Sequence, residues 1–142
     1  MRIADVLRSK GSAVATVGAA DSVADLLAAL AEHNVGALVV LGPDGMAGIA
    51  SERDVVRRLH ERGRDLLDAP VSEIMTSEVF TCTPRDSVDS LTVLMTERRI
   101  RHVPVLDGDR LVGIVSIGDV VKSRIDQLQT DHDQLAAYIA QG

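Results

Sequence analysis

An eight-residue pattern occurs twice in this chain, as GIASERDV at residues 48–55 and as GIVSIGDV at residues 113–120. The two copies lie 65 residues apart, and the match needs no gap from Thr16 and Thr81 to the end of the pattern. Upstream, the residues that begin at Ile3 match those that begin at Val71, once three extra residues are allowed near Lys10. Self-similarity at a fixed offset indicates a duplicated structural unit.

Each copy predicts the same order of elements, β-α-β-β-α, preceded by a short segment. We expect a small strand near Thr16 and another near Thr81. Hydroxyl side chains suited to N-capping precede the predicted helices, at Ser22, Ser51, Ser87 and Ser116. The β-rich runs lie at 37–41, 46–50, 102–106 and 111–115. On the first helix, Val23, Leu26, Leu27 and Leu30 share one apolar stripe. The chain is therefore predicted to be an α+β protein made of two tandem repeats.

The duplication divides the chain into four predicted parts. The first repeat spans 1–60 and the second spans 71–124, and a charged segment with Gly and Pro at 61–70 is interpreted as a linker. Residues 125–142 extend the last helix. Its apolar residues fall at spacings of four and three, with His132 in the series: Val121, Ile125, Leu128, Leu135 and Ile139. This seam predicts a homodimer contact; the alternative is a helix folded back on its own module.

Composition excludes several classes of function. The chain has 142 residues, of which 46% are hydrophobic and 25% charged, as in ordinary globular domains. A net charge of −6 argues against sequence-independent binding to nucleic acid or to an anionic membrane. Phe80 and Tyr138 are the only aromatic residues, so base-stacking platforms are scarce. We expect a cytoplasmic protein, because the one cysteine, Cys82, allows no internal disulfide and no signal peptide or membrane span is recognisable.

The repeated pattern carries the chemistry. In each copy a Ser stands where a strand ends and a helix begins, and an Asp follows three residues later. A helix N-terminus suits an anion, a Ser hydroxyl can bond a ribose or phosphate oxygen, and a carboxylate can accept both hydrogens of a ribose diol. The Gly at the start of the pattern is expected to let a ligand approach the backbone. The alternative is that Ser-x-x-Asp is only a capping box.

With both patterns in register, and with RHVPV at 101–105, the repeat resembles the CBS domain, named after cystathionine β-synthase. The resemblance covers roughly Ile3 to Arg124, and the tandem arrangement resembles a Bateman module. It implies a pseudo-twofold pair with two clefts that hold adenosine-type ligands such as AMP, ADP, ATP, NAD or S-adenosylmethionine. It also implies a role in signal transduction or energy sensing rather than catalysis, with no required cofactor.

The resemblance also implies roles for particular residues. Asp54 and Asp119 are similar to ribose ligands, and Ser51 and Ser116 to hydroxyls at the helix start. The expected base-bordering residues are Thr16, Thr81 and Thr83. Phosphate-facing groups are expected at Arg101 and His102, and Arg53 has a charge that the second repeat lacks. The two clefts should therefore be unequal, although the sequence leaves open which of them gathers the positive groups.

No nucleophile–base arrangement, P-loop or metal-ligand spacing is recognisable, so the chain is not predicted to be an enzyme. Cys82 is interpreted as a small buried apolar residue. The basic run from Arg57 to Arg64 is interpreted as a solvated helix end and linker; the alternative is a patch that binds phosphate or a partner. A ligand-free homodimeric scaffold that regulates a partner enzyme is the alternative to a nucleotide sensor.

Overall fold

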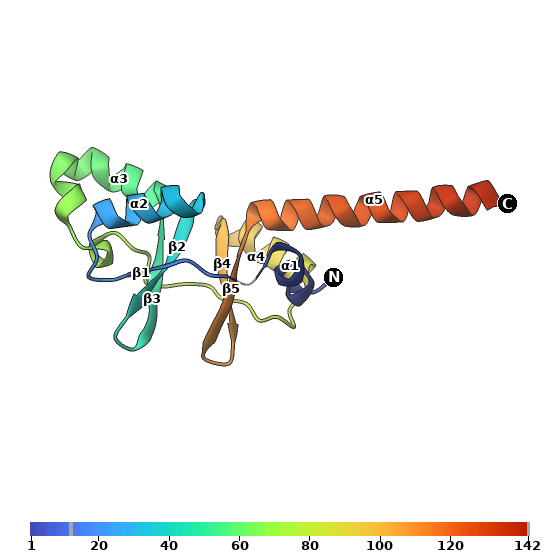
Figure 1. Ribbon diagram of the computed structural model, residues 1–142, viewed down its shortest axis with the longest axis horizontal. Coiled ribbons are helices and arrows are strands. Elements are labelled where there is room, and N and C mark those ends of the chain that lie inside the picture. Colours follow the sequence, from blue (N-terminus) through green and yellow to red (C-terminus); the bar gives the residue numbers. More distant parts are fainter. Residues whose placement is uncertain (12, 142) are drawn as a thin grey trace.

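A computed structural model describes residues 1–11 and 13–141 and confirms the α+β fold of two repeats with a C-terminal helix (Figure 1). The first repeat contains β1 (Thr16–Gly18), α2 (Val23–His33), β2 (Ala37–Gly42), β3 (Gly45–Ser51) and α3 (Glu52–Arg62). The second contains α4 (Val88–Arg98), β4 (His102–Asp107), β5 (Arg110–Ser116) and α5 (Ile117–Gln141). One further helix, α1 (Ile3–Lys10), lies before β1. Two 3-10 turns, η1 (Gly63–Asp68) and η2 (Val71–Glu73), lie between α3 and α4.

Helix ends follow the expected capping chemistry. The Ser22 hydroxyl accepts a hydrogen bond from the Asp25 amide at 3.1 Å, and the Ser87 hydroxyl accepts one from Ser90 at 3.0 Å. The apolar stripe of α2 is buried at Val23, Leu26 and Leu30, but Leu27 remains 36% exposed. One helical residue lies 100° from the next, so Leu27 falls at the edge of the buried face.

The two sheets differ at one strand. β1 lies parallel to β2, which pairs antiparallel with β3, whereas the strand expected near Thr81 is reduced to a single bridge between Cys82 and Val105. In the first repeat, the Ala19 amide extends the ladder by donating to the Leu41 carbonyl at 2.9 Å. Pro84 stands at the matching position and has no N–H to donate. The ladder of the second repeat therefore stops after one residue.

The core of each repeat includes the segment that precedes the other repeat in the sequence. The core of the first repeat includes Leu66, Ala69, Val71 and Ile74, and that of the second includes Ile3, Val6 and Leu7. The two exchanged segments are held by matching backbone hydrogen bonds. Val71 N donates to Asp21 O at 2.8 Å, and Ile3 N donates to Asp86 O at 2.9 Å. The segment expected to be a linker is thus folded, and its Leu66 is fully buried.

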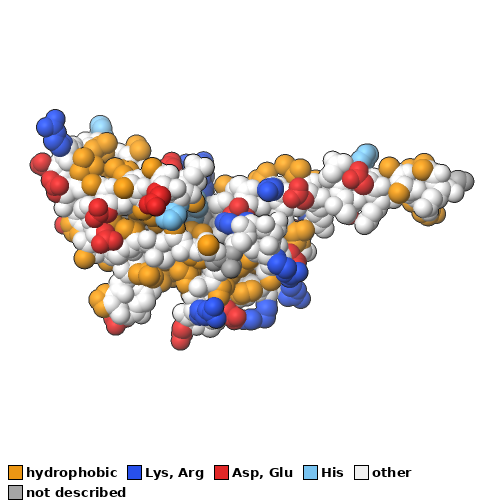
Figure 2. Space-filling model, in the orientation of Figure 1, with side chains coloured by type: hydrophobic (Ala, Val, Ile, Leu, Met, Phe, Trp, Pro, Cys, Tyr) orange, Lys and Arg blue, Asp and Glu red, His pale blue; other side chains and the backbone are white. Residues whose placement is uncertain are grey.

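The C-terminal helix stays against the body as far as Arg124, whose guanidinium lies 3.5 Å from the Asp89 carboxylate, and then extends away from it (Figure 1). Val120 is buried in the second core, but the apolar seam that follows is open. Its residues are more than half exposed: Val121 51%, Ile125 59%, Leu128 58%, Leu135 58% and Ile139 67%. Figure 2 shows hydrophobic side chains near both the base and the free end of this helix. Within the described chain, no helix is long and apolar enough to cross a membrane.

Candidate functional site

Both Ser-x-x-Asp motifs form capping boxes at a strand-to-helix junction. The Ser51 amide donates to Asp54 Oδ2 at 2.9 Å, and the Ser116 amide donates to Asp119 Oδ2 at the same distance. The Asp54 and Asp119 amides donate back to the two hydroxyls at 3.3 and 3.1 Å. The capping interpretation therefore holds for both motifs, and the cap fixes each carboxylate at the start of its helix.

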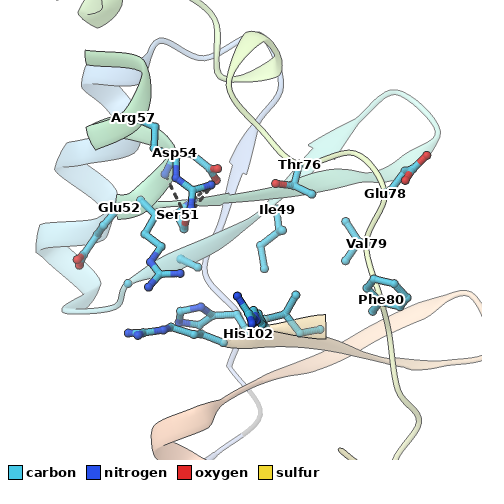
Figure 3. A pocket seen from close by; sticks show the side chains of 16 residues that line it. Ile49, Ser51, Glu52, Asp54, Arg57, Thr76, Glu78, Val79, Phe80 and His102 are labelled. Carbon is cyan, nitrogen blue, oxygen red and sulfur yellow. Dashed lines mark hydrogen bonds between the residues drawn. The ribbon is translucent and has the colours of Figure 1, made fainter. Parts of the chain in front are cut away.

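A cleft of about 410 Å³ opens beside the first motif (Figure 3). Three segments line it: the start of α3, the connection from Thr76 to Phe80, and the residues that lead into β4. Its volume lies in the range usual for small-molecule sites. Because α3 belongs to the first repeat and β4 to the second, the cleft is a joint product of the two repeats.

Positive groups from both repeats converge on this first cleft. Its lining includes Arg53, Arg57, Arg99, Arg101 and His102. The cleft thus combines the arginine unique to the first repeat with the basic pair unique to the second. Arg57 was named only in the alternative of a phosphate patch, and Arg99 was not predicted. Arg57 follows Asp54 by one helical turn, so its spacing could have marked it, whereas only the fold turns Arg99 toward the cleft.

Burial lowers the pKa of His102 below its ordinary value and outweighs the nearby carboxylates of Asp119 and Glu52, which act in the other direction; Lys10 and Arg101 also lower it. His102 is therefore neutral near pH 7, and the arginines supply the permanent charge of the cleft.

An apolar surface lies opposite the carboxylate of Asp54. It includes Ile49, Val79, Ile100 and Phe80, the only phenylalanine of the chain. The Arg98 guanidinium lies 5.0 Å from the centre of the Phe80 ring, within cation–π distance. Phe80 remains 42% exposed. The sequence analysis counted Phe80 only as a scarce aromatic residue; its place in the cleft follows from the path of the connection between the repeats.

The second motif has a different environment. Lys10 Nζ donates to Asp119 Oδ2 at 2.6 Å and to the Ile114 carbonyl at 2.8 Å. Although partial burial opposes the shift, hydrogen bonds from Lys10 and from the Ser116 backbone hold the pKa of Asp119 below its ordinary value. The neighbouring cavity, of about 280 Å³, is called the second cleft; α1 and α5 line it, with Lys10, Asp119 and Lys122 among its residues.

Other predicted site residues lie elsewhere. Thr16 is on β1, and Thr83 donates its amide to Asp86 at 2.8 Å. For the described chain, the linings of these two cavities include Ser51, Arg53, Asp54, Arg101, His102 and Asp119 but not Thr16, Thr81, Thr83 or Ser116.

The two motif glycines serve the chain's own packing. A Cβ on Gly48 would lie 2.5 Å from the Thr76 carbonyl oxygen, and one on Gly113 would lie 2.5 Å from the Leu7 side chain. The expectation that these glycines admit a ligand is wrong, because Thr76 and Leu7 occupy that space. Burial also raises the pKa of Cys82 to about 12, which fits its interpretation as a packing residue.

Comparisons with known proteins agree with this architecture. The family model described as CBS domain matches residues 3–61 and 71–126. The mitochondrial CBS domain-containing protein CBSX3 of Arabidopsis thaliana is 39% identical over 149 residues, which cover 99% of this chain and 72% of that protein. The crystal structure of the CBS-domain protein ATU1752 from Agrobacterium tumefaciens is 43% identical, with a TM-score of 0.83 over 87% of this chain and 92% of that one.

A third similar structure contains ligands. The CBS domain pair of protein MJ0100, in complex with 5′-methylthioadenosine and S-adenosyl-L-methionine, is 26% identical with a TM-score of 0.79. The similarity covers 89% of this chain and 98% of that one.

Proposed function

This chain belongs to the CBS domain family as a tandem pair of its repeats, and from that premise we propose that it is a non-catalytic sensor of a phosphorylated adenosine compound. The observation that carries the proposal is the convergence of four arginines on a cleft that also presents Asp54 and an apolar surface. In this proposal the first cleft is the ligand site.

Each part of such a ligand has a matching surface. Among the described residues, the recorded hydrogen bonds to the Asp54 carboxylate all come from Ser51 and all reach Oδ2. Oδ1 is therefore free to accept from a ribose diol. Ile49, Val79 and Phe80 offer apolar surface to a base.

Phosphate recognition falls to Arg53, Arg57, Arg99 and Arg101. Charge-assisted hydrogen bonds are roughly twice as strong as neutral ones. A protein of net charge −6 needs such a local concentration of positive charge to hold an anion. AMP, ADP, ATP and NAD are accordingly favoured over uncharged adenosyl compounds and over S-adenosylmethionine, whose sulfonium is positive.

A thermal-melt series with AMP, ADP, ATP, NAD and S-adenosylmethionine tests this function. A ligand at 100 times its Kd stabilises the folded state by about 2.7 kcal/mol, which a melt resolves readily. We expect Asp54→Asn to abolish most of the shift and the matched variant Asp119→Asn to keep it. If no adenosyl compound moves the melting temperature at millimolar concentration, the scaffold alternative replaces the sensor.

We also propose that the protein is a homodimer. The exposed seam of α5 supports this, because an apolar stripe on a helix that leaves the body gains stability by covering itself, at roughly 25 cal/mol per Å² buried. The same contact would serve the scaffold alternative, in which a partner enzyme is regulated without a ligand. The oligomeric state therefore does not distinguish sensor from scaffold, and the ligand melt does.

A further inference from the structure

One pair of matching residues has different backbone hydrogen-bond partners in the two repeats. In the first repeat, Ile49 forms a two-bond bridge with Thr76: Ile49 N donates to Thr76 O at 3.0 Å, and Thr76 N donates to Ile49 O at 2.9 Å. Ile114 is the matching residue of the second repeat, and its carbonyl accepts from Lys10 Nζ at 2.8 Å. A side-chain ammonium thus replaces a backbone amide at the edge of β5.

The cause lies in the three extra residues near Lys10. They let the segment before the first repeat form a full helix, α1, which runs to Lys10, whereas its counterpart η2 ends at Glu73. Because α1 packs in the core of the second repeat, its last residue, Lys10, lies at the second motif rather than the first.

The contact of Lys10 neutralises the carboxylate on which a ribose would depend. Lys10 Nζ lies 2.6 Å from Asp119 Oδ2, and the two side chains are only 33% and 22% exposed. That oxygen also accepts from the Ser116 amide. A ribose diol could take its place only by breaking this ion pair, whose donor carries a full positive charge that a hydroxyl lacks. In the part of the chain that the structure describes, the Asp54 carboxylate accepts hydrogen bonds from Ser51 and forms no ion pair.

We propose that Lys10 is an internal occupant of the second cleft that excludes ribose from Asp119, so that each chain binds one nucleotide, in the first cleft. This inference rests on the proposed function of the first cleft and adds a specificity-determining residue to it. Among the described residues, Lys10 pairs with the carboxylate of Asp119, whereas no cation is paired with the matching carboxylate of Asp54. Removing its side chain opens the second motif to an adenosyl ligand.

Calorimetry with ATP and with adenosine tests the inference. We expect about one site per wild-type chain, two sites in Lys10→Ala, and a return to one in Lys10→Ala combined with Asp119→Asn. Arg8→Ala is the matched control, since it removes an exposed cation from the same helix and should leave one site. Two sites in the wild type, or one site in a folded Lys10→Ala variant, would overturn the inference while leaving the sensor function intact; no binding at all would overturn the function itself.

A second measurement needs no ligand and is not affected by a loss of stability on removing Lys10. The chain has two lysines, Lys10 and Lys122. With an amine-reactive ester, read out by peptide mass spectrometry, Lys10 should be modified several-fold more slowly than the exposed Lys122. Asp119→Asn should remove that protection. Equal rates in the wild type would show that Lys10 does not hold the carboxylate in solution.

Discussion

At the scale of single residues, Arg99 combines a backbone cost with a place in the cleft. It ends α4 in the left-handed region, at φ 53°, and Asn34 ends α2 in the same way at φ 52°. Asn tolerates this region better than Arg does. In the proposed function, the phosphate contact of its side chain offsets this cost in stability.

We therefore expect Arg99→Asn to raise the free energy of unfolding by up to about 1 kcal/mol while it weakens ATP binding several-fold. Adenosine binding should change little, since that ligand carries no phosphate. Urea unfolding and calorimetry measure the two effects. Asn34→Arg is the matched control: it should lower stability and leave ATP binding alone. Weaker adenosine binding in Arg99→Asn would instead indicate a general distortion of the cleft.

We expect His102 to make both the stability of the protein and its binding of ATP depend on pH. Burial lowers its pKa in the folded state below the ordinary value of 6.5, so the unfolded chain binds the proton more readily. The stability associated with neutral His102 is fully present above pH 6.5 and is lost as pH falls through the lower, folded pKa. Denaturation curves between pH 7.5 and 5 should show this decline, and His102→Gln should flatten it.

The same titration acts on the ligand in the opposite sense. Protonated His102 adds a positive charge to the phosphate side of the cleft, so ATP affinity should rise as pH falls from 7 toward 6. In His102→Gln the rise should be smaller than in the wild type. An ATP affinity that is equally pH-dependent in both proteins would place the titrating group on the nucleotide.

At the scale of elements, α5 carries a self-complementary seam. An antiparallel pair of these helices centred on Thr130 brings Val121 to Ile139, Ile125 to Leu135 and Leu128 to His132 of the second copy. A twofold contact of this kind is isologous, since each pair occurs twice. In this arrangement His132 faces Leu128 of the second copy and lies off the symmetry axis.

Leu128→Glu combined with Leu135→Glu should convert a dimer to a monomer at tens of micromolar, as measured by light scattering. The reason is that two carboxylates would replace apolar contacts on each helix. Thr130→Glu combined with Ala137→Glu adds the same charge on the opposite side of the helix and should leave the dimer intact. A monomeric wild-type protein would contradict the dimer, and an unchanged dimer in the leucine variant would place the contact elsewhere.

At the scale of the whole molecule, the exchanged segments make the two repeats one folding unit. Ile3 belongs in sequence to the first repeat but lies fully buried in the core of the second, and Val71 does the reverse. Neither repeat, taken as a continuous stretch, contains its own complete core. The pair should therefore unfold in a single transition, and the cleft between the repeats is held together by the same exchange.

Ile3→Ala should lower the free energy of unfolding by about 2–5 kcal/mol, as is usual for a truncated core isoleucine. Hydrogen exchange in the native state should become faster mainly in β4 and β5, although the substitution lies more than ninety residues earlier. Faster exchange mainly in β2 and β3 would show that α1 packs on the first repeat.

The sequence alone determined the local structure of this protein. The 65-residue offset, the capping serines and the alternation of apolar residues predicted the two repeats and nearly every element, because each signal acts within a few residues of the chain. The missing strand before Pro84 was readable in principle, since a proline cannot donate to a ladder. Ser51, Asp54, Arg101 and His102 were predicted as site residues through the motif and the family resemblance.

Only the tertiary structure decided how these parts meet. Arg53 and Arg101 lie 48 positions apart, and nothing local indicates that they share a cleft; the packing of one repeat on the other brings them together. The three extra residues near Lys10 were visible in the alignment of the repeats. Their consequence, an ammonium placed on Asp119, depends on α1 packing against the second repeat instead of the first. The physical reason is that a contact between distant side chains is set by where whole elements pack, whereas caps, turns and helical stripes are set by neighbouring residues.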